Sequence, residues 1–370
     1  MLVTFGSVQR PDGGLQVRAR VLAESLAALG IPAAIVSTRE PDRRAPLPAW
    51  ARSYHVPVRK PTKGFSLEFS RLIRDVAADS DVVFIANAMF MPALAVSRVS
   101  LPMIWDTNEC QSLHYSRLPR TARNRARQVV WTGLERWAAR RSRLAVSIGG
   151  PEAREWRSRY PALRKKLVTV DHVPFAHAVT QESARASVAR LAGVPLEGPI
   201  LVFVGTLAAK HNLVAAQWIV DVLAPSLPEA VTVLLCGPGS DRFQGSGGGA
   251  RVVGLGMVDD VDSVVASGDL CLAPLASGAG VKTKVLHYLV HGRRVAGTPL
   301  AFEGLENAPG TFSASLDDLP ALVGRLIASA EPVPEDEQRV AAQRAWMAEH
   351  HAQEQAVRQW REVLGCLKLK

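Results

Sequence analysis

The sequence predicts an α/β protein with two domains, each an open, mostly parallel sheet covered by helices. Its 370 residues exceed the length of one typical domain. Both halves of the chain alternate short apolar runs with glycine-containing loops and amphipathic segments, and such alternation produces parallel sheets covered on both faces. The hydrophobic fraction of 48% and the charged fraction of 21% are typical of globular chains and exclude an intrinsically disordered one.

The first half of the chain begins with an apolar strand near the N-terminus, followed by a loop that contains Gly13 and Gly14. A helix is expected from Leu15, because leucines recur at helical spacing until Gly30 ends the pattern. We assign residues 1–175 to this domain. Its further strands are expected at residues 31–38, 81–88, 101–108 and 143–150. The apolar stretch 82–96 is read as a buried strand plus a loop.

The second half repeats this order of elements after a proline-containing segment, and we assign residues 176–340 to the second domain. Residues 341–370 are expected to be a helical tail that packs back towards the first domain, as part of a long helix over 335–364. The strands are expected at 199–206, 231–239, 251–256, 269–275 and 293–299, and the helices at 215–227 and 282–292.

The charge of the chain favours anionic partners, because the formal net charge is +10. Basic residues concentrate in the stretch 116–143. This stretch has two interpretations: a solvated helix with Trp131, Leu134 and Trp137 facing inward, or a helix face that rests on anionic lipid headgroups. Nucleic-acid binding is not expected, since no helix-turn-helix, RNA-recognition or zinc-finger pattern accompanies the charge.

The cysteines and histidines give no sign of a metal or a cofactor. The four cysteines are scattered and are expected to be reduced, and the adjacent His350 and His351 do not face one site. No metal and no cofactor are therefore expected. No apolar run reaches membrane-spanning length and no leader pattern opens the chain, which predicts a cytoplasmic protein, with peripheral contact at the inner face of the membrane as a further option. The usage of Ala, Arg and Gly is typical of a bacterial source with GC-rich DNA.

The most informative segment for chemistry is 270–305. A strand ends near Pro274, a loop of small residues follows at 277–280, and a helix then begins. Helix N-termini present unpaired amides and a partial positive charge, so this turn is suited to a diphosphate. Lys282 and Lys284 lie where a cation meets phosphate oxygens. An ordinary strand-to-helix turn is the alternative.

This segment resembles the donor-binding signature of the GT-B glycosyltransferases, especially the retaining enzymes of family 4 (group 1). The Gly-Gly loop at 13–14 and the stretches 203–225, 231–241 and 252–275 resemble the same family in the same order, most strongly over 200–305. The resemblance implies two Rossmann-like domains whose parallel sheets face a central cleft that binds the donor.

The resemblance also implies a set of donor-binding residues. Lys210 and Lys284 would bind the diphosphate, while Gly278, Ala279 and Gly280 would offer backbone amides. Family members commonly carry two glutamates separated by seven residues, and here those positions hold Ala279 and His287. For these positions, ordinary loop or packing roles are the alternatives. The remaining donor-site candidates are Gly13, Gly14, Asn212, Glu303 and Gly304.

The candidate catalytic residues follow an expected strand in the first domain. Asp106, Glu109 and His114 resemble the stretch that contacts the acceptor and the reacting sugar, and would orient or deprotonate the acceptor hydroxyl. Their alternative role is structural, since acidic residues after a strand often cap the next helix. His172 is an additional candidate.

Taken together, these observations predict a glycosyltransferase that moves a sugar from a UDP-, GDP- or TDP-sugar to an acceptor hydroxyl, with retention and without a metal. The acceptor is a glycan, a lipid-linked molecule or a small molecule, within polysaccharide or natural-product biosynthesis. The alternative is a catalytically inactive scaffold of the same fold that binds a nucleotide or a protein partner.

Overall fold

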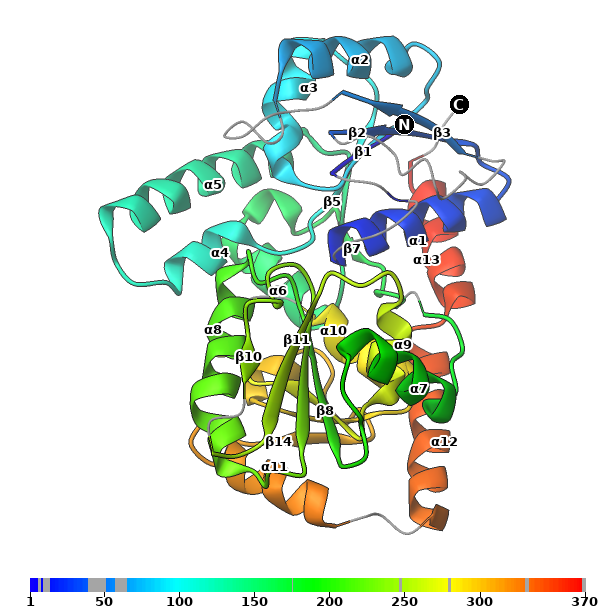
Figure 1. Cartoon of the computed structure of the whole chain (residues 1–370). Coiled ribbons are helices and arrows are strands. Elements are labelled where there is room, and N and C mark those ends of the chain that lie inside the picture. The colour runs from blue at the N-terminus through cyan, green and yellow to red at the C-terminus, as the bar shows by residue number, and fades with distance from the viewer. Residues whose placement is uncertain are drawn as a thin grey trace. The chain divides into compact units, whose positions relative to one another are not determined.

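A computed structural model describes residues 1–5, 8, 14–38, 51–56, 65–174, 176–245, 248–278, 281–329 and 333–367. The chain divides into two compact units (Figure 1). The first unit comprises Met1–Val173 together with His351–Lys370, and the second comprises Pro174–His350. Each unit contains a seven-stranded sheet, and helices alternate with most of the strands along the chain, so the predicted α/β class is confirmed. Among the described residues, no helix is long and apolar enough to cross a membrane.

The sheet of the first unit has the strand order β3-β2-β1-β4-β5-β6-β7, and all its pairings are parallel. The order reverses between β1 and β4, which are hydrogen-bonded neighbours. Its strands are β1 Leu2–Thr4, β2 Ala33–Ser37, β3 Ala51–His55, β4 Val83–Ile85, β5 Met103–Asp106, β6 Leu144–Ser147 and β7 Leu167–Thr169. Its helices are α1 Gly14–Ala28, α2 Leu67–Ala77, α3 Met91–Ser97, α4 Gln111–Ser116, α5 Ala122–Arg141, α6 Gly150–Arg159 and α13 Gln353–Gly365.

Aromatic packing connects the sheet of this unit to helices from distant parts of the chain. Trp105 on β5 meets Trp156 on α6 edge to face, with 5.0 Å between ring centroids. Trp360 on α13 packs against Phe84 on β4 at 5.9 Å, also edge to face, and α13 contacts α1. The three tryptophans are fully buried, so each stabilises the unit mainly through apolar area removed from water.

The sheet of the second unit has the strand order β10-β11-β9-β8-β12-β13-β14, with only the β10–β11 pair antiparallel. This is the order of the doubly wound nucleotide-binding fold, and it reverses between β8 and β12. Its strands are β8 Ile200–Val204, β9 Thr232–Cys236, β10 Gln244–Gly245, β11 Arg251–Gly256, β12 Leu270–Ala273, β13 Arg294–Gly297 and β14 Thr311–Ser313. Its helices are α7 Gln181–Ala192, α8 Lys210–Trp218, α9 Val261–Ser267, α10 Thr283–Val290, α11 Leu319–Ala328 and α12 Val333–His350.

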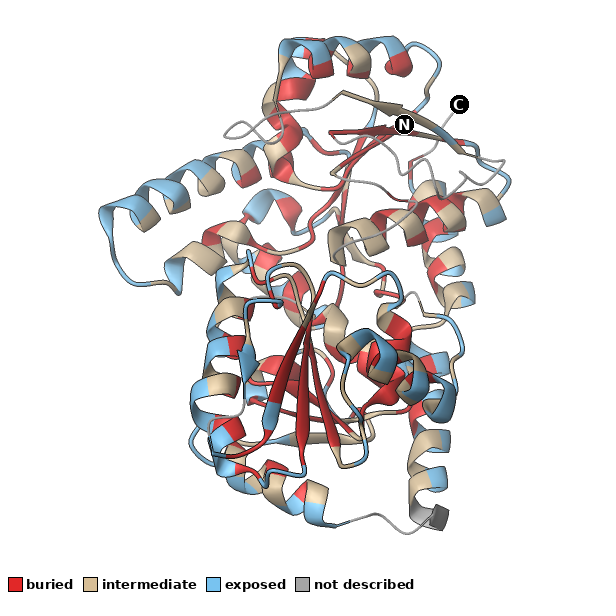
Figure 2. Cartoon of the chain, viewed as in Figure 1, coloured by how far each residue is buried: buried red, intermediate tan, exposed pale blue. Residues whose placement is uncertain are grey.

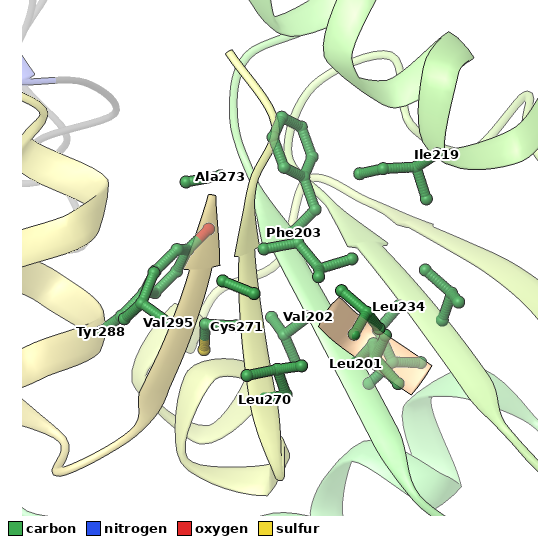
Figure 3. Packing of buried hydrophobic residues seen from close by; sticks show 14 of the residues in the cluster. Leu201, Val202, Phe203, Ile219, Leu234, Leu270, Cys271, Ala273, Tyr288 and Val295 are labelled. Carbon is green, nitrogen blue, oxygen red and sulfur yellow. The ribbon is translucent and has the colours of Figure 1, made fainter. Parts of the chain in front are cut away.

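The central strands of this sheet are covered on both faces. Residues 200–203 of β8 are all inaccessible to solvent, which requires cover on both sides because successive side chains point to opposite faces (Figure 2). Figure 3 shows the resulting packing, with Phe203, Leu234 and Tyr288 among the buried side chains. The Tyr288 hydroxyl accepts a hydrogen bond of 2.8 Å from the Val204 amide, which joins α10 to the end of β8.

Three expectations for individual elements are wrong in whole or in part. The long C-terminal helix is two helices, because α12 packs against α10 in the second unit whereas α13 packs against α1 in the first. Within α5 the expectation fails in part: Leu134 packs partly buried against the core, but the fully buried residues are Glu135, Ala138 and Ala139, and Trp137 is 40% exposed. The stretch 82–96 holds β4, then a 3-10 turn, and then α3 instead of a loop.

Candidate functional site

The carboxyl ends of β8 and β12 meet at the point where the strand order of the second sheet reverses. The two strands pair in parallel, with Leu201 opposite Leu270 and Val202 opposite Cys271. In open α/β sheets, ligands bind outside the carboxyl ends of the strands at such a reversal. The segment after β8 leads into α8, and the segment after β12 leads into α10. Residues from these two connections therefore form the candidate site of the second unit.

Lys284 in the first turn of α10 is the central cation of this site. Its Nζ donates a hydrogen bond of 2.7 Å to Asn212 Oδ1 on α8 and lies 4.1 Å from the centroid of the Phe203 ring. Asn212 is buried, and its Nδ2 donates to the Thr206 carbonyl at 3.2 Å. Because the amide nitrogen is engaged by a carbonyl, the amide oxygen must face the ammonium. Two of the predicted donor residues thus hold each other in place.

Two glycines make room for this arrangement. A Cβ added to Gly205 would lie 2.8 Å from Asn212 Cγ and 3.0 Å from Lys284 Nζ, which is closer than real side chains approach. A Cβ on Gly237, which follows β9, would lie 2.4 Å from the Gly205 carbonyl oxygen, and Gly237 also has a φ of +126°. The sequence analysis missed both glycines, although a glycine directly after an apolar strand in 199–206 and 231–239 was the available signal.

The environment of Lys284 disfavours the protonated, charged form of its side chain. Burial and, as the smaller cause, the neighbouring charge of Lys282 together lower the pKa of the ammonium to about 7. An anion bound beside Nζ would favour the charged form and raise this pKa again. By contrast, Lys210 is exposed at the first turn of α8. The two predicted phosphate-binding lysines therefore differ in solvation.

The other predicted donor residues lie on separate connections. Gly278 follows β12 with a φ of +139°, a conformation that favours glycine. Glu303 is exposed after β13, and the neighbouring Gly304 has a φ of +81° and donates its N–H to Glu306. Gly14 is the first residue of α1 in the other unit. Gly13, Ala279 and Gly280 lie outside the described residues.

His287 faces a carboxylate. Its Nε2 lies 2.5 Å from Oδ1 of Asp262 on α9, and Nε2 of His291 lies 2.8 Å from the same oxygen. Burial alone would raise the pKa of Asp262, but hydrogen bonds from the two imidazoles hold it well below its usual range. The sequence analysis named His287 but missed Asp262 and His291. The spacing of the two histidines, four residues apart near the end of a helix, was the signal.

In the first unit, Asp106 at the end of β5 forms a buried ion pair. Arg18 Nε on α1 lies 2.9 Å from both carboxylate oxygens, and each side chain is 3% exposed. Burial raises the pKa of Asp106, and the Arg18 guanidinium opposes that shift. Arg18 Nη1 also donates to the Val170 carbonyl after β7, so the pair connects β5, α1 and β7. Both oxygens of Asp106 are engaged by this internal cation.

Glu109 and His114 form the second pair of predicted residues in this unit. Oε1 of Glu109 lies 3.3 Å from Nδ1 of His114, and Gln111 Nε2 donates to Glu109 Oε2 at 2.9 Å. Both side chains are half-buried. The turn that presents them contains Asn108, whose φ is +45° and whose amide donates to the Ala86 carbonyl after β4. The loop is thereby anchored beside the reversal point of the first sheet.

Two further buried polar groups of the first unit are His172 and Glu135. The imidazole of His172 is inaccessible, and burial lowers its pKa to about 3, so the ring is neutral at physiological pH. Glu135 on α5 accepts hydrogen bonds from the Tyr160 hydroxyl at 2.5 Å and from the Ser112 amide at 3.2 Å. The sequence analysis missed this second network, which fixes the start of α4 and thereby the segment that carries His114.

Comparison with known proteins finds a glycosyltransferase family and glycosyltransferase structures. Residues 198–328 match the model of the family described as Glycosyl transferases group 1. No curated protein sequence matches the chain. Among solved structures, sucrose-phosphate synthase from Thermosynechococcus elongatus superposes with a TM-score of 0.73 at 15% identity, covering 99% of this chain and 98% of that one.

Two more structures cover nearly the whole chain. WaaG, a glycosyltransferase involved in lipopolysaccharide biosynthesis, has a TM-score of 0.72 at 14% identity and covers 98% of this chain and 99% of its own. HepE from Anabaena, in complex with UDP and glucose, has a TM-score of 0.68 at 12% identity with the same coverage. This protein therefore has the fold of the GT-B glycosyltransferases, and its second unit carries the sequence pattern of the group 1 glycosyl transferases.

Proposed function

We propose that this protein is a glycosyltransferase that moves a sugar from a nucleotide-sugar donor to an acceptor hydroxyl, with retention of anomeric configuration. The observation that carries the proposal is the Lys284–Asn212 pair at the strand reversal of the second sheet. Both residues lie within the segment that matches the group 1 family. A solvent-poor cation at the carboxyl ends of parallel strands is suited to bind the diphosphate of a donor.

The proposed chemistry rests on stabilising the leaving group. As the bond between the sugar and the diphosphate breaks, negative charge grows on the phosphate oxygen that departs. Lys284 would donate to that oxygen from a site of low polarity, where such an interaction is stronger than in water. Lys210 would contact the diphosphate from solvent, and Gly278, Ala279 and Gly280 would contribute backbone amides. In this proposal the cations are lysines and no metal is needed.

On the acceptor side, we assign the contact with the incoming hydroxyl to Glu109 and His114. Their side chains lie 3.3 Å apart, so an acceptor hydroxyl can hydrogen-bond to one while the other fixes its partner's orientation. Asp106 would instead be a positioning residue that does not contact the acceptor, since its two oxygens already accept hydrogen bonds from Arg18. Glu109 and His114 are thus the first choices for substitution on this side.

The donor and the location are the finer parts of the proposal. UDP-glucose is the first donor to test, because the HepE structures contain UDP or UDP-glucose; GDP- and TDP-sugars follow. We also propose contact with anionic membrane on the cytoplasmic side. On α5 the exposed Val129 and Val130 follow Arg123, Arg125 and Arg127, and apolar residues flanked by arginines favour an anionic lipid surface.

Release of the nucleoside diphosphate from each donor tests this function, with and without a mixture of acceptors. For wild type we expect turnover with one nucleotide class, and for Lys284→Met a loss of most of the rate, because the leaving-group charge is then unsupported. Glu303→Gln, at an exposed position, tests whether the donor site includes Glu303, because the rate of nucleoside diphosphate release should fall only if it does. Tight nucleotide binding without any turnover would favour the inactive scaffold. No binding of any nucleotide would contradict the glycosyltransferase and leave only a scaffold that binds a protein partner.

A further inference from the structure

Three imidazoles of the second unit converge on one carboxylate, that of Asp262. His287 and His291 approach the same oxygen, Oδ1, at 2.5 Å and 2.8 Å. His177, in the segment before α7, contacts the other oxygen, Oδ2, through Nδ1 and also donates its backbone N–H to it at 3.2 Å. The group combines residues from three separate elements, 85 and 25 positions apart in sequence. Local helix or loop geometry alone therefore does not produce it.

The inner part of this group is shielded from solvent. The side chains of Asp262, His291 and His287 are 8%, 5% and 15% exposed, respectively. The two imidazole rings lie 5.2 Å apart at an angle of 57°, so they are not stacked on each other but both direct Nε2 at the carboxylate. Three imidazole nitrogens and one backbone N–H thus face the two oxygens of Asp262. Imidazole nitrogens and carboxylate oxygens are also the atoms by which proteins bind zinc.

The ligand atoms have the identity and spacing for a transition metal. The carboxylate oxygen and the two Nε2 atoms all lie within 4.8 Å of one another. Zinc binds imidazole and carboxylate at about 2.0–2.2 Å in a tetrahedral arrangement, which separates its ligand atoms by roughly 3.3 Å. The rings need to move outward by less than about 1 Å to reach that separation. Histidines four residues apart on a helix place both imidazoles on one side of a metal.

We propose that Asp262, His287 and His291 bind a divalent transition-metal ion of the zinc class. His177, which is 58% exposed and contacts the other oxygen of Asp262, lies on the solvent side of this group. Two imidazoles with one carboxylate select zinc or cobalt over magnesium or calcium, which prefer oxygen ligands. The ion would join α9 to α10, the helix that also carries Lys284. This site does not depend on the proposed glycosyl transfer.

Metal titration of the tag-free full-length protein tests the proposal. After removal of metal by a chelator, Co²⁺ is added and its visible absorption bands are recorded, and Zn²⁺ is then added in competition. We expect one equivalent to bind, tetrahedral Co²⁺ bands that Zn²⁺ abolishes, and a higher melting temperature with Zn²⁺ because the metal binds only the folded state. Binding of Mg²⁺ in preference to Zn²⁺ would overturn the assignment.

Variants separate this site from adventitious binding. His291→Gln and Asp262→Asn should weaken Zn²⁺ by more than about tenfold, since even outer-shell partners of metals contribute that much. His350→Gln, which removes an exposed imidazole on α12, is the matched control and should bind as wild type does. Melting curves of the metal-free variants check that they fold. Failure of wild type to bind one equivalent of Zn²⁺ would overturn the proposal. Equal affinity of His291→Gln and His350→Gln for Zn²⁺ would also overturn it.

Discussion

The ammonium of Lys284 and the side-chain oxygen of Asn212 are joined by a hydrogen bond of 2.7 Å across 72 residues of sequence. The bond connects the first turns of α10 and α8, the two helices that follow β12 and β8. It therefore fixes the direction of the cation relative to the strand reversal, before any ligand arrives. Because the ammonium of Lys284 is already held in place, binding a ligand there does not incur the entropic cost of ordering a long flexible side chain.

Gly205→Ala should disrupt this arrangement without changing any charge. The added Cβ would meet Asn212 and Lys284 Nζ within about 3 Å, so one of the two side chains must move. Loss of one charge-assisted hydrogen bond corresponds to about 1.5–3 kcal/mol, or roughly a tenfold to hundredfold weaker affinity for the donor. Calorimetric titration with the nucleotide-sugar that wild type prefers measures the effect.

The matched control for this variant is Gly324→Ala. A Cβ at Gly324, in the middle of α11, meets nothing within 4 Å. This substitution should leave donor affinity unchanged and stabilise the helix by up to about 1 kcal/mol. If both variants bound the donor as wild type does, the close approach of Gly205 would have no role in binding.

Donor binding should take up a proton near neutral pH. The pKa of Lys284 in the free protein is about 7, and a bound diphosphate raises it. At pH 8 the free lysine is mostly neutral and the bound lysine charged, so uptake should approach one proton. At pH 6 the free lysine is already charged, and uptake should vanish. Titrations with UDP-glucose in buffers of different ionisation enthalpy give this number directly.

Lys284→Met serves as the comparison for proton uptake, since methionine is of similar length and does not titrate. The variant should bind more weakly and show no proton uptake at pH 8. Equal uptake in wild type and variant would assign the proton to another group.

Asp106→Asn should destabilise the first unit. Removing the charge leaves the Arg18 guanidinium buried without its counter-ion, which typically costs about 3–5 kcal/mol. Urea unfolding followed by tryptophan fluorescence measures this loss, since Trp105 is adjacent in sequence. Glu24→Gln on the same helix breaks a partly exposed pair with Arg20 and should cost no more than about 1 kcal/mol. A fully stable Asp106→Asn variant that lost only turnover would instead assign Asp106 to catalysis.

The α5 surface should bind vesicles that contain anionic lipid. Val129 and Val130 are 72% and 60% exposed beside arginines, so binding should combine apolar contact with charge attraction and weaken as salt increases. The double substitution Val129→Ser and Val130→Ser should reduce co-sedimentation with these vesicles. Leu191→Ser, at a 55% exposed position on α7, is the control. Equal sedimentation with neutral vesicles would contradict the electrostatic part.

The fold was largely predictable, because alternating strands and helices are local patterns. The segment around Lys284 could be singled out as a donor-site candidate from the sequence, since it resembles a known signature, and its role in donor binding stays a prediction. The partners of the site residues were not: Arg18 pairs with Asp106 across 88 positions, and Asp262 meets His287 across 25. Such contacts arise only when elements pack. The break between α12 and α13 has the same origin, since each helix packs against a different unit.

The split of the first unit along the chain has a consequence for its synthesis. Trp360, which packs on Phe84, and the rest of α13 leave the ribosome only after all of the second unit has been made. Until then the apolar residues of α1 and of the first sheet that pack against α13 lack this cover. The second unit is continuous in sequence and can fold first, although it is the later of the two to begin.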